Sequence, residues 1–344
     1  MRGRQFTFWT RLVPVFALAL LFSACASLPE DLQQEHSQTW QQPEETFLGQ
    51  TIAEAAPDDT SLSGVELLAE PEAAFTTRFA LANLAEKSLD LQYYLWKGDL
   101  AGGLLLWAAL EAADRGVQVR FLIDDIYHSG RDDVYALLDT HENFEVRIFN
   151  PMANRGAGRY INYALNRKHL NHRMHNKIWL ADNAVAVLGG RNIGNDYFGV
   201  DTKANFFDLD VLTTGQGARE AGAAFDEYWN SKYAVPIHVL NKKSFTQEHL
   251  EEGRKELDAF LEDMDVMPYA ITVDSEETIE KLKAWRDELA WVRAHVVVDP
   301  LERFEGQGES AIVEFNREHI ASIETDFIAE SAYLIPSQEG IAAM

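Results

Sequence analysis

A histidine and a lysine two positions apart are the residues of this sequence best suited to chemistry. If Lys177 begins a β-strand, His175 and Lys177 point to the same face, because alternate strand residues share a face. Gly189 and Gly190 then allow the backbone to approach and contact the substrate closely, and Asn192 offers a neutral donor at the same mouth. This set suits metal-free phosphoryl transfer, in which the histidine attacks phosphorus while the lysine and asparagine hold the phosphate oxygens.

The segment around this pair is basic in an otherwise acidic chain. No acidic residue lies between Glu145 and Asp182, although the whole 344-residue chain has a net charge of −25. The local field of residues 146–181 should therefore be positive, and we expect an anionic substrate group to bind there, with Arg173 and Arg191 among its ligands. On charge alone, a solvated basic loop is the alternative interpretation.

A metal site is a second interpretation of the same segment. His169, His172 and His175 are spaced by three and could share a helical face. Neighbouring basic residues would repel a divalent ion, and no carboxylate lies close in sequence, so we expect neither a metal nor another cofactor. The chain's single cysteine also excludes an intramolecular disulfide and a zinc site of the finger type.

Alternating short apolar runs and longer amphipathic runs must position these residues. The pattern predicts an α/β fold, with a mixed or parallel sheet covered by helices on both faces. The expected strands are 65–68, 88–96, 117–126, 144–149, 177–181, 184–189 and 206–212, and the expected helices are 71–86, 99–114, 217–233, 245–263 and 276–294, with one more beginning near residue 131.

The spacing of H-x-K, of Asp182 five residues after the lysine, and of the following Gly and Asn resembles the phospholipase D superfamily. Five identities are set over the eighteen positions from His175 to Asn192, which makes the pattern specific. The segments 189–198 and 207–211 resemble the cardiolipin synthase branch in particular, and the similarity covers about residues 62–235.

The resemblance implies a phospholipase D-like fold and a phosphohistidine mechanism without a cofactor. It implies that phosphatidylglycerol accepts a phosphatidyl group from a second phospholipid, such as phosphatidylethanolamine, to give cardiolipin. It makes His175 the catalytic histidine, with Lys177 and Asn192 as phosphate ligands. Asp208 falls where the family places an acid that orients histidine, and Asp182 belongs to the motif but is expected to tie down a turn.

The sequence departs from the family pattern because a second H-x-K does not follow between residues 201 and 344. We expect either a truncated member, with one complete half and the start of a second, or a chain that completes its site as a homodimer. A weak echo of the strand 91–96 at 332–336 favours truncation, and with it low transferase activity of this chain alone.

Two other functions remain open. The superfamily also cleaves lipid and nucleic-acid phosphodiesters, although the acidic chain predicts no general affinity for nucleic acid. A lipoprotein that binds lipid head groups without turnover is the non-enzymatic alternative.

The N-terminus predicts export and a lipid anchor. Arginines precede an apolar run over 12–22 that is too short to span a bilayer, and Cys25 follows it at a lipobox-like cleavage point. We expect a lipoprotein on the periplasmic face of the outer membrane. The expected organisation is a signal peptide over 1–24, a flexible tether over 25–62, a phospholipase D-like half over 63–235, and an acidic helical linker with the start of a second half over 236–344.

Overall fold

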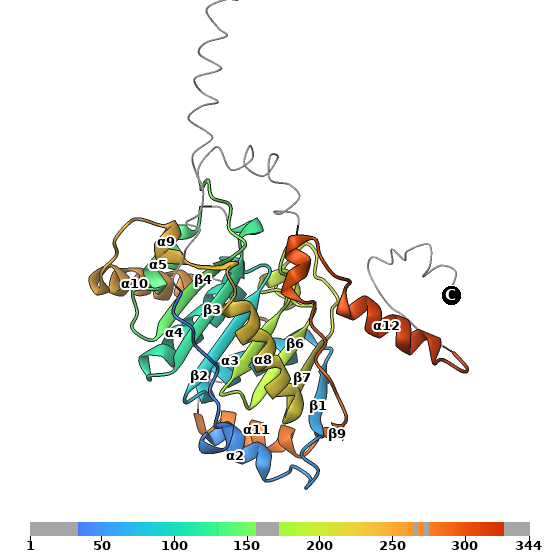
Figure 1. Ribbon diagram of the computed structural model, residues 1–344. Coiled ribbons are helices and arrows are strands. Elements are labelled where there is room, and N and C mark those ends of the chain that lie inside the picture. The colour runs from blue at the N-terminus through green and yellow to red at the C-terminus, as the bar shows by residue number, and fades with distance from the viewer. Residues whose placement is uncertain (1–33, 129, 156–171, 264–266, 272–274, 327–344) are drawn as a thin grey trace, which may run out of the picture.

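A computed structural model describes residues 34–128, 130–155, 172–263, 267–271 and 275–326. Within these residues one mixed sheet runs through the molecule, in the order β8-β4-β3-β2-β5-β6-β7-β1-β9 (Figure 1). The strands are β1 Ser63–Leu68, β2 Ser88–Tyr93, β3 Gln118–Asp124, β4 Phe144–Phe149, β5 Ile178–Ala181, β6 Val185–Gly189, β7 Asp210–Thr214, β8 Ala234–Pro236 and β9 Ala290–Val292.

Strand direction follows the length of the connections. The β2–β3 and β3–β4 pairs are parallel and are joined through helices, whereas β5, β6 and β7 pair antiparallel. The β5–β6 hairpin turns at Asp182 and Asn183, whose φ angles are 53° and 52°. Asp and Asn tolerate this left-handed conformation better than other residues with a Cβ do, so the turn chemistry agrees with the hairpin.

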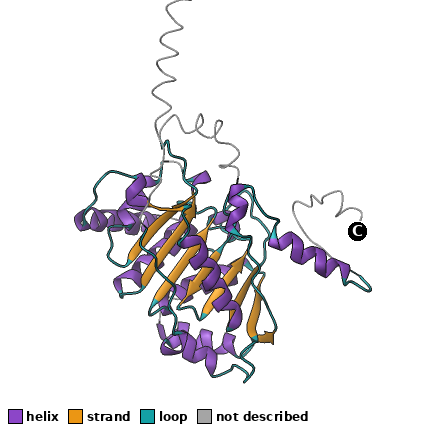
Figure 2. Ribbon diagram, viewed as in Figure 1, coloured by secondary structure: helices purple, strands orange, loops and turns teal. Residues whose placement is uncertain are grey.

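Helices cover both faces of the sheet (Figure 2). Along β5, Trp179 belongs to the cluster packed under α3 and α4, whereas Ile178 and Leu180 belong to the cluster under α8. Because alternate strand residues face opposite sides, α8 lies on the face opposite α3 and α4. The helices are α2 Phe47–Ala53, α3 Pro71–Leu84, α4 Leu100–Asp114, α5 Asp132–Leu138, α8 Gln216–Trp229, α9 Ile237–Leu240, α10 Gln247–Asp263, α11 Ser275–Arg286 and α12 Ala311–Ala321.

Most of the predicted elements are confirmed within a few residues. Pro71 occupies the first turn of α3, and the Asp99 side chain caps α4 by accepting a hydrogen bond from the Gly102 amide at 3.1 Å. The strand predicted over 206–212 instead begins at Asp210, and the preceding apolar residues are exposed.

The tether prediction is wrong for residues 37–62. Asp226 on α8 accepts a hydrogen bond from the Thr39 amide at 3.0 Å, and the side chain of Asn230 accepts one from the Ser37 amide at 3.1 Å. Leu48 on α2 is fully buried in the main core. This segment is polar because few of its positions face the core, and those few are anchored by apolar contacts and side-chain hydrogen bonds.

Residues 245–292, which were expected to form an acidic linker, pack against the first unit. Helix α10 packs on α4, and α11 packs on α3. The helix predicted over 276–294 ends at Arg286, and β9 then extends the sheet by pairing with β1. These acidic helices bury one apolar side each against the first unit.

Several predictions concern residues outside the described ones: the signal peptide, Cys25 and the strand echo at 332–336. In the part of the chain that the structure describes, no helix has both the length and the hydrophobicity to cross a bilayer.

Candidate active site

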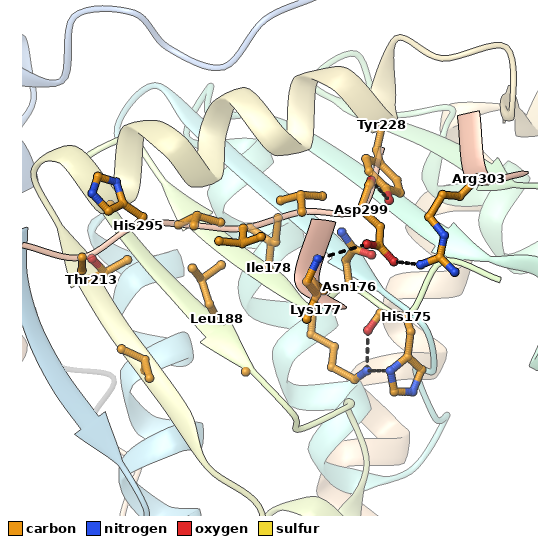
Figure 3. A pocket seen from close by; sticks show the side chains of 18 of the residues that line it. His175, Asn176, Lys177, Ile178, Leu188, Thr213, Tyr228, His295, Asp299 and Arg303 are labelled. Carbon is orange, nitrogen blue, oxygen red and sulfur yellow. Dashed lines mark hydrogen bonds and ion pairs between the residues drawn. The ribbon is translucent and has the colours of Figure 1, made fainter. Parts of the chain in front are cut away.

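The H-x-K pair lies immediately before the central strand β5. It is therefore at the end of the sheet where the parallel strands β2 and β3 have their carboxyl ends. Lys177 Nζ lies 3.2 Å from His175 Nδ1 and donates a hydrogen bond to the His175 carbonyl oxygen at 2.6 Å (Figure 3). The prediction that the two side chains share a face is therefore confirmed. Strand β5 begins one residue later than expected, at Ile178.

An aromatic side chain completes this pair. The Tyr94 ring lies edge to face with the His175 ring at 4.7 Å, and Lys177 Nζ lies 5.7 Å from the Tyr94 ring centroid. Residue type alone does not assign Tyr94 to the site, because a tyrosine is common in a β-strand. The feature that could have predicted this role is the position of Tyr94 directly after the parallel strand β2, where ligand sites of such sheets lie.

Burial tunes both members of the pair. It lowers the pKa of His175, and the positive charge of Lys177 lowers that pKa further, so the imidazole is neutral at pH 7. Burial also lowers the pKa of Lys177 to about 8, against the opposing effect of Asp208 and Asp210. A neutral imidazole beside an ammonium is the protonation state that a nucleophilic histidine and a phosphate ligand need.

The glycine pair makes room for aspartates of the neighbouring strand rather than for a ligand. A Cβ on Gly190 would lie 1.9 Å from Asp208 Oδ1, and a Cβ on Gly189 would lie 2.1 Å from Asp210 Oδ1. Both glycines therefore let the two carboxylates approach the Lys177 end of the sheet. Gly190 is therefore packed against protein atoms, whereas Gly189 also lines the adjacent cavity, so its contact with substrate stays a prediction.

Asp208 lies before β7 instead of sharing a strand face with Asp210. Its Oδ1 accepts a hydrogen bond from the Leu209 amide at 2.9 Å, and its charge raises the pKa of Lys177. Among the described residues, its contacts thus lead to the lysine of the pair and not to His175. Asp210 is fully buried against Arg78, which contacts its Oδ2 at 2.8 Å.

Arg191 is a structural residue, contrary to the prediction that it binds substrate. It is 1% exposed, its guanidinium donates hydrogen bonds to the carbonyl oxygens of Leu68 and Ala69, and it lies 3.5 Å from Asp210. These bonds tie the segment after β6 to the end of β1. A buried guanidinium with these partners does not reach a ligand.

In the described part of the acid-free window, two arginines pair with acids from other segments. Arg173 pairs with Asp124, and Arg155 pairs with Asp125 and Asp132. Burial raises the pKa of Asp124 to about 6, although Arg173 opposes that shift. Of the window's basic residues that the structure describes, Lys177 has no carboxylate at ion-pair distance. Arg173 and Lys177 both line the pocket, but the charge of Arg173 is paired with Asp124, and of these two Lys177 is the cation without a carboxylate at ion-pair distance.

Asn192 and Asp182 both bind protein groups. The Asn192 side chain accepts from the Leu95 amide at 3.2 Å and donates to the Tyr197 hydroxyl at 2.9 Å. Asn192 therefore holds the segment after β2 near the site, and its role as a phosphate ligand stays a prediction.

Asp182 lies at the opposite end of β5 from His175, which corrects its place among the catalytic candidates. It is fully buried, and its carboxylate accepts hydrogen bonds from the amides of Glu86, Lys87 and Ser88 at 2.7 to 3.2 Å. The interpretation that Asp182 ties down a turn agrees with these contacts.

A cavity of about 680 Å³ opens beside the pair. His175, Asn176 and Lys177 line one end of it, and His295 lies at the other end (Figure 3). In the described residues, no three His, Cys, Asp or Glu side chains gather as metal ligands would. His169 lies outside those residues.

Comparisons with known proteins agree with this geometry. Residues 79–229 match the family described as "Cardiolipin synthase, PLD-like domain". The chain is 36% identical over 275 residues to cardiolipin synthase C of Escherichia coli strain K12, which covers 79% of this chain and 57% of that protein. It is 30% identical over 192 residues to a cardiolipin synthase of Clostridium perfringens strain SM101, covering 55% of this chain and 38% of that protein.

A solved structure, NucT from Helicobacter pylori, is 17% identical with a TM-score of 0.38, covering 51% of this chain and 98% of that one. The chain spans about half the length of the curated relatives that it matches. The segment that matches the family contains the site residues discussed above: His175, Lys177, Gly189, Gly190, Asp208 and Asp210. This chain therefore belongs to the phospholipase D superfamily, with a domain of the cardiolipin synthase family over residues 79–229.

Proposed function

We propose that this chain supplies the nucleophilic half of a phosphatidyltransferase site that makes cardiolipin from phosphatidylglycerol and a second phospholipid. The observation that supports it most directly is the neutral His175 imidazole held 3.2 Å from the Lys177 ammonium at the mouth of a cavity. A nucleophile and a phosphate ligand in one place are the minimum for phosphodiester chemistry.

In the first step, the His175 imidazole attacks the phosphorus of the donor lipid. The phosphorus–oxygen bond to the leaving alcohol breaks, and a phosphatidyl-histidine forms. We assign the attack to Nε2, the ring nitrogen that does not face Lys177, in the tautomer that carries its proton on Nδ1. Lys177 stabilises the charge that builds on the phosphate oxygens, Asp208 favours the charged form of Lys177, and Asn192 holds the segment after β2 in place.

The leaving alcohol needs a proton, and the acceptor needs a base. By family resemblance we assign both tasks to the histidine of a second H-x-K unit, which a second copy of this chain or a further C-terminal half would supply. In the second step, a hydroxyl of phosphatidylglycerol attacks the phosphorus, loses its proton to that base, and the nitrogen–phosphorus bond breaks. Water in place of the lipid acceptor would give hydrolysis.

A chromogenic phosphodiester tests the nucleophile without the second unit. From bis(p-nitrophenyl) phosphate the p-nitrophenolate leaves without protonation at neutral pH, so His175 alone suffices for the first step. We expect a burst of one p-nitrophenolate per chain and a phosphoryl adduct on His175, detected by mass spectrometry after an alkaline quench.

The matched controls are His175→Asn and His238→Asn. His238 is an exposed histidine on α9, outside the cavity. The burst and the adduct should vanish in the first variant and persist in the second. No adduct on wild-type His175, or an equal burst in His175→Asn, would contradict the proposed nucleophile. Cleavage of single-stranded DNA that requires His175 would favour a nuclease instead.

We further propose that Cys25 carries a lipid anchor and that the protein faces the periplasm from the outer membrane. The basic start, the short apolar run and the position of the single cysteine support this. Metabolic labelling with a radioactive fatty acid should mark the wild-type chain and not Cys25→Ser. Equal labelling of both would contradict the anchor.

A further inference from the structure

The cavity beside His175 has an aliphatic floor. Ile178, Leu188 and Val211 lie directly opposite one another on β5, β6 and β7, and all three line the cavity. Residues paired across neighbouring strands project from the same face, so they form a continuous row. The row continues on β1 to Leu67, which pairs with Val211 and is 64% exposed. An apolar path therefore runs from the H-x-K end across four strands.

The roof is a strap of chain over residues 294–304, which runs beside α8 (Figure 3). Val296 and Val298 of this strap also line the cavity. Roof and floor thus present aliphatic side chains to the same space. Its volume of about 680 Å³ falls within the range of about 300–1,000 Å³ that is typical of small-molecule sites.

Hydrogen bonds hold the strap in place over this space. The Val296 amide donates to Glu220 of α8 at 2.7 Å, and the Tyr228 hydroxyl donates to the Asp299 carbonyl at 2.9 Å. Phe304 packs against Phe149 at 5.0 Å between ring centroids and ends the strap in the second core cluster. Because the roof is fixed at both ends, the aliphatic walls keep their separation.

Polar groups are concentrated at the end where the reaction is proposed. His175, Asn176 and Lys177 lie there, next to the ion pair of Asp299 and Arg303 (Figure 3). The remaining length is lined mainly by aliphatic side chains. A ligand that fits has an anionic group at one end and a hydrocarbon chain leading away from it.

We propose that this cavity binds one acyl chain of a phospholipid whose phosphodiester lies at Lys177. The proposal rests on the proposed function, because it takes Lys177 as the ligand of the phosphodiester. It adds a subsite that selects acylated substrates over their water-soluble head groups. Each methylene group of the acyl chain that moves from water into contact with the aliphatic side chains strengthens binding by about fourfold.

Two ligands separate the head-group site from the acyl site. Glycerophosphoglycerol carries the phosphodiester without acyl chains, and dihexanoyl phosphatidylglycerol, used below its micelle concentration, carries short ones. Calorimetric titration of the full chain should give at least tenfold tighter binding of the acylated ligand. This affinity ratio measures the acyl contribution directly.

Val211→Trp fills the cavity from its floor, and Val298→Trp fills it from its roof. We expect both variants to reduce the affinity ratio at least tenfold while the affinity for glycerophosphoglycerol stays the same. Val134→Trp is the matched control, because Val134 is an exposed valine on α5 that does not line the cavity. Two fillers from independent segments keep the test valid if one of them fails to fold.

Each result has one meaning. Equal affinities for the two ligands in the wild type, or a ratio that neither filler changes, would overturn the acyl site. A lack of glycerophosphoglycerol binding, or binding that Lys177→Met leaves unchanged, would instead contradict the proposed phosphodiester site. The two failures are therefore distinguishable.

Discussion

Arg78 on α3 and Asp210 at the start of β7 form an ion pair of 2.8 Å in which both side chains are fully buried. Tyr93 accepts a hydrogen bond from Arg78 Nε at 3.0 Å, and the Arg191 amide donates to Asp210 at 3.2 Å. The same carboxylate raises the pKa of Lys177. A helix on one face of the sheet is thus linked to the candidate active site through a single aspartate.

We expect Asp210→Asn to lower the free energy of unfolding by about 3–5 kcal/mol, because it leaves the Arg78 charge buried and unpaired. Urea denaturation followed by circular dichroism measures the change. The matched control is Asp133→Asn, which removes an exposed pair with Lys243 and should leave stability unchanged. Similar small changes in both variants would show that the buried pair is not stabilising.

Phosphodiester binding should depend on pH through Lys177. Its pKa is lowered to about 8, so the ammonium that holds the phosphate is present below pH 8 and is lost above it. We expect the affinity for glycerophosphoglycerol to fall by up to tenfold per pH unit above that point. Lys177→Arg should keep its affinity to higher pH, because a guanidinium stays protonated there. Identical pH profiles for both proteins would exclude Lys177 as the titrating group.

Asp182→Ala should reduce stability without weakening head-group binding by the folded protein. The carboxylate accepts from three backbone amides, and alanine both leaves these without their acceptor and fits poorly at a φ of 53°. We expect a loss of about 3 kcal/mol or more in chemical denaturation. If binding at a temperature where the variant is folded fell as much as in Lys177→Met, a role at the substrate would be indicated.

The segment before β1 should contribute to stability. Leu48 is fully buried, and Leu48→Ala should cost about 2–5 kcal/mol, as expected for a leucine removed from a packed core. Leu67→Ala, at a leucine that is 64% exposed, provides the control with the same chemical change. A flexible tether predicts no effect at Leu48, so equal stability of the two variants would restore that interpretation.

The local pattern predicted the elements that position the site. Helix starts and alternating strands depend on residues that are close in the chain, so the sequence predicts them. Examples are Pro71, Asp99 and the runs around residues 88–93 and 144–149. The same holds for His175 and Lys177, whose convergence needs only an extended backbone between them.

The partners of charged side chains were decided by the tertiary structure. Arg173 and Arg191 look like substrate ligands in a window without acids, yet Asp124 lies 49 residues from the first, and the second bonds to carbonyls more than 120 residues away. Which carboxylate or carbonyl faces a guanidinium depends on strand order, and strand order is a long-range property. The need for glycine at 189 and 190 is long-range for the same reason, since the close neighbours are Asp210 on β7 and Asp208 just before it.

By itself, the sequence determined the fold class and the convergence of His175 and Lys177, and it predicted the kind of bond that this pair attacks, because these depend on residue identity and short spacing. The tertiary structure alone decided that Asp124 pairs with Arg173, that Tyr94 lies against His175, and that a roofed aliphatic cavity begins beside them. These features arise where strands distant in sequence meet at one edge of the sheet, and no local pattern specifies that meeting.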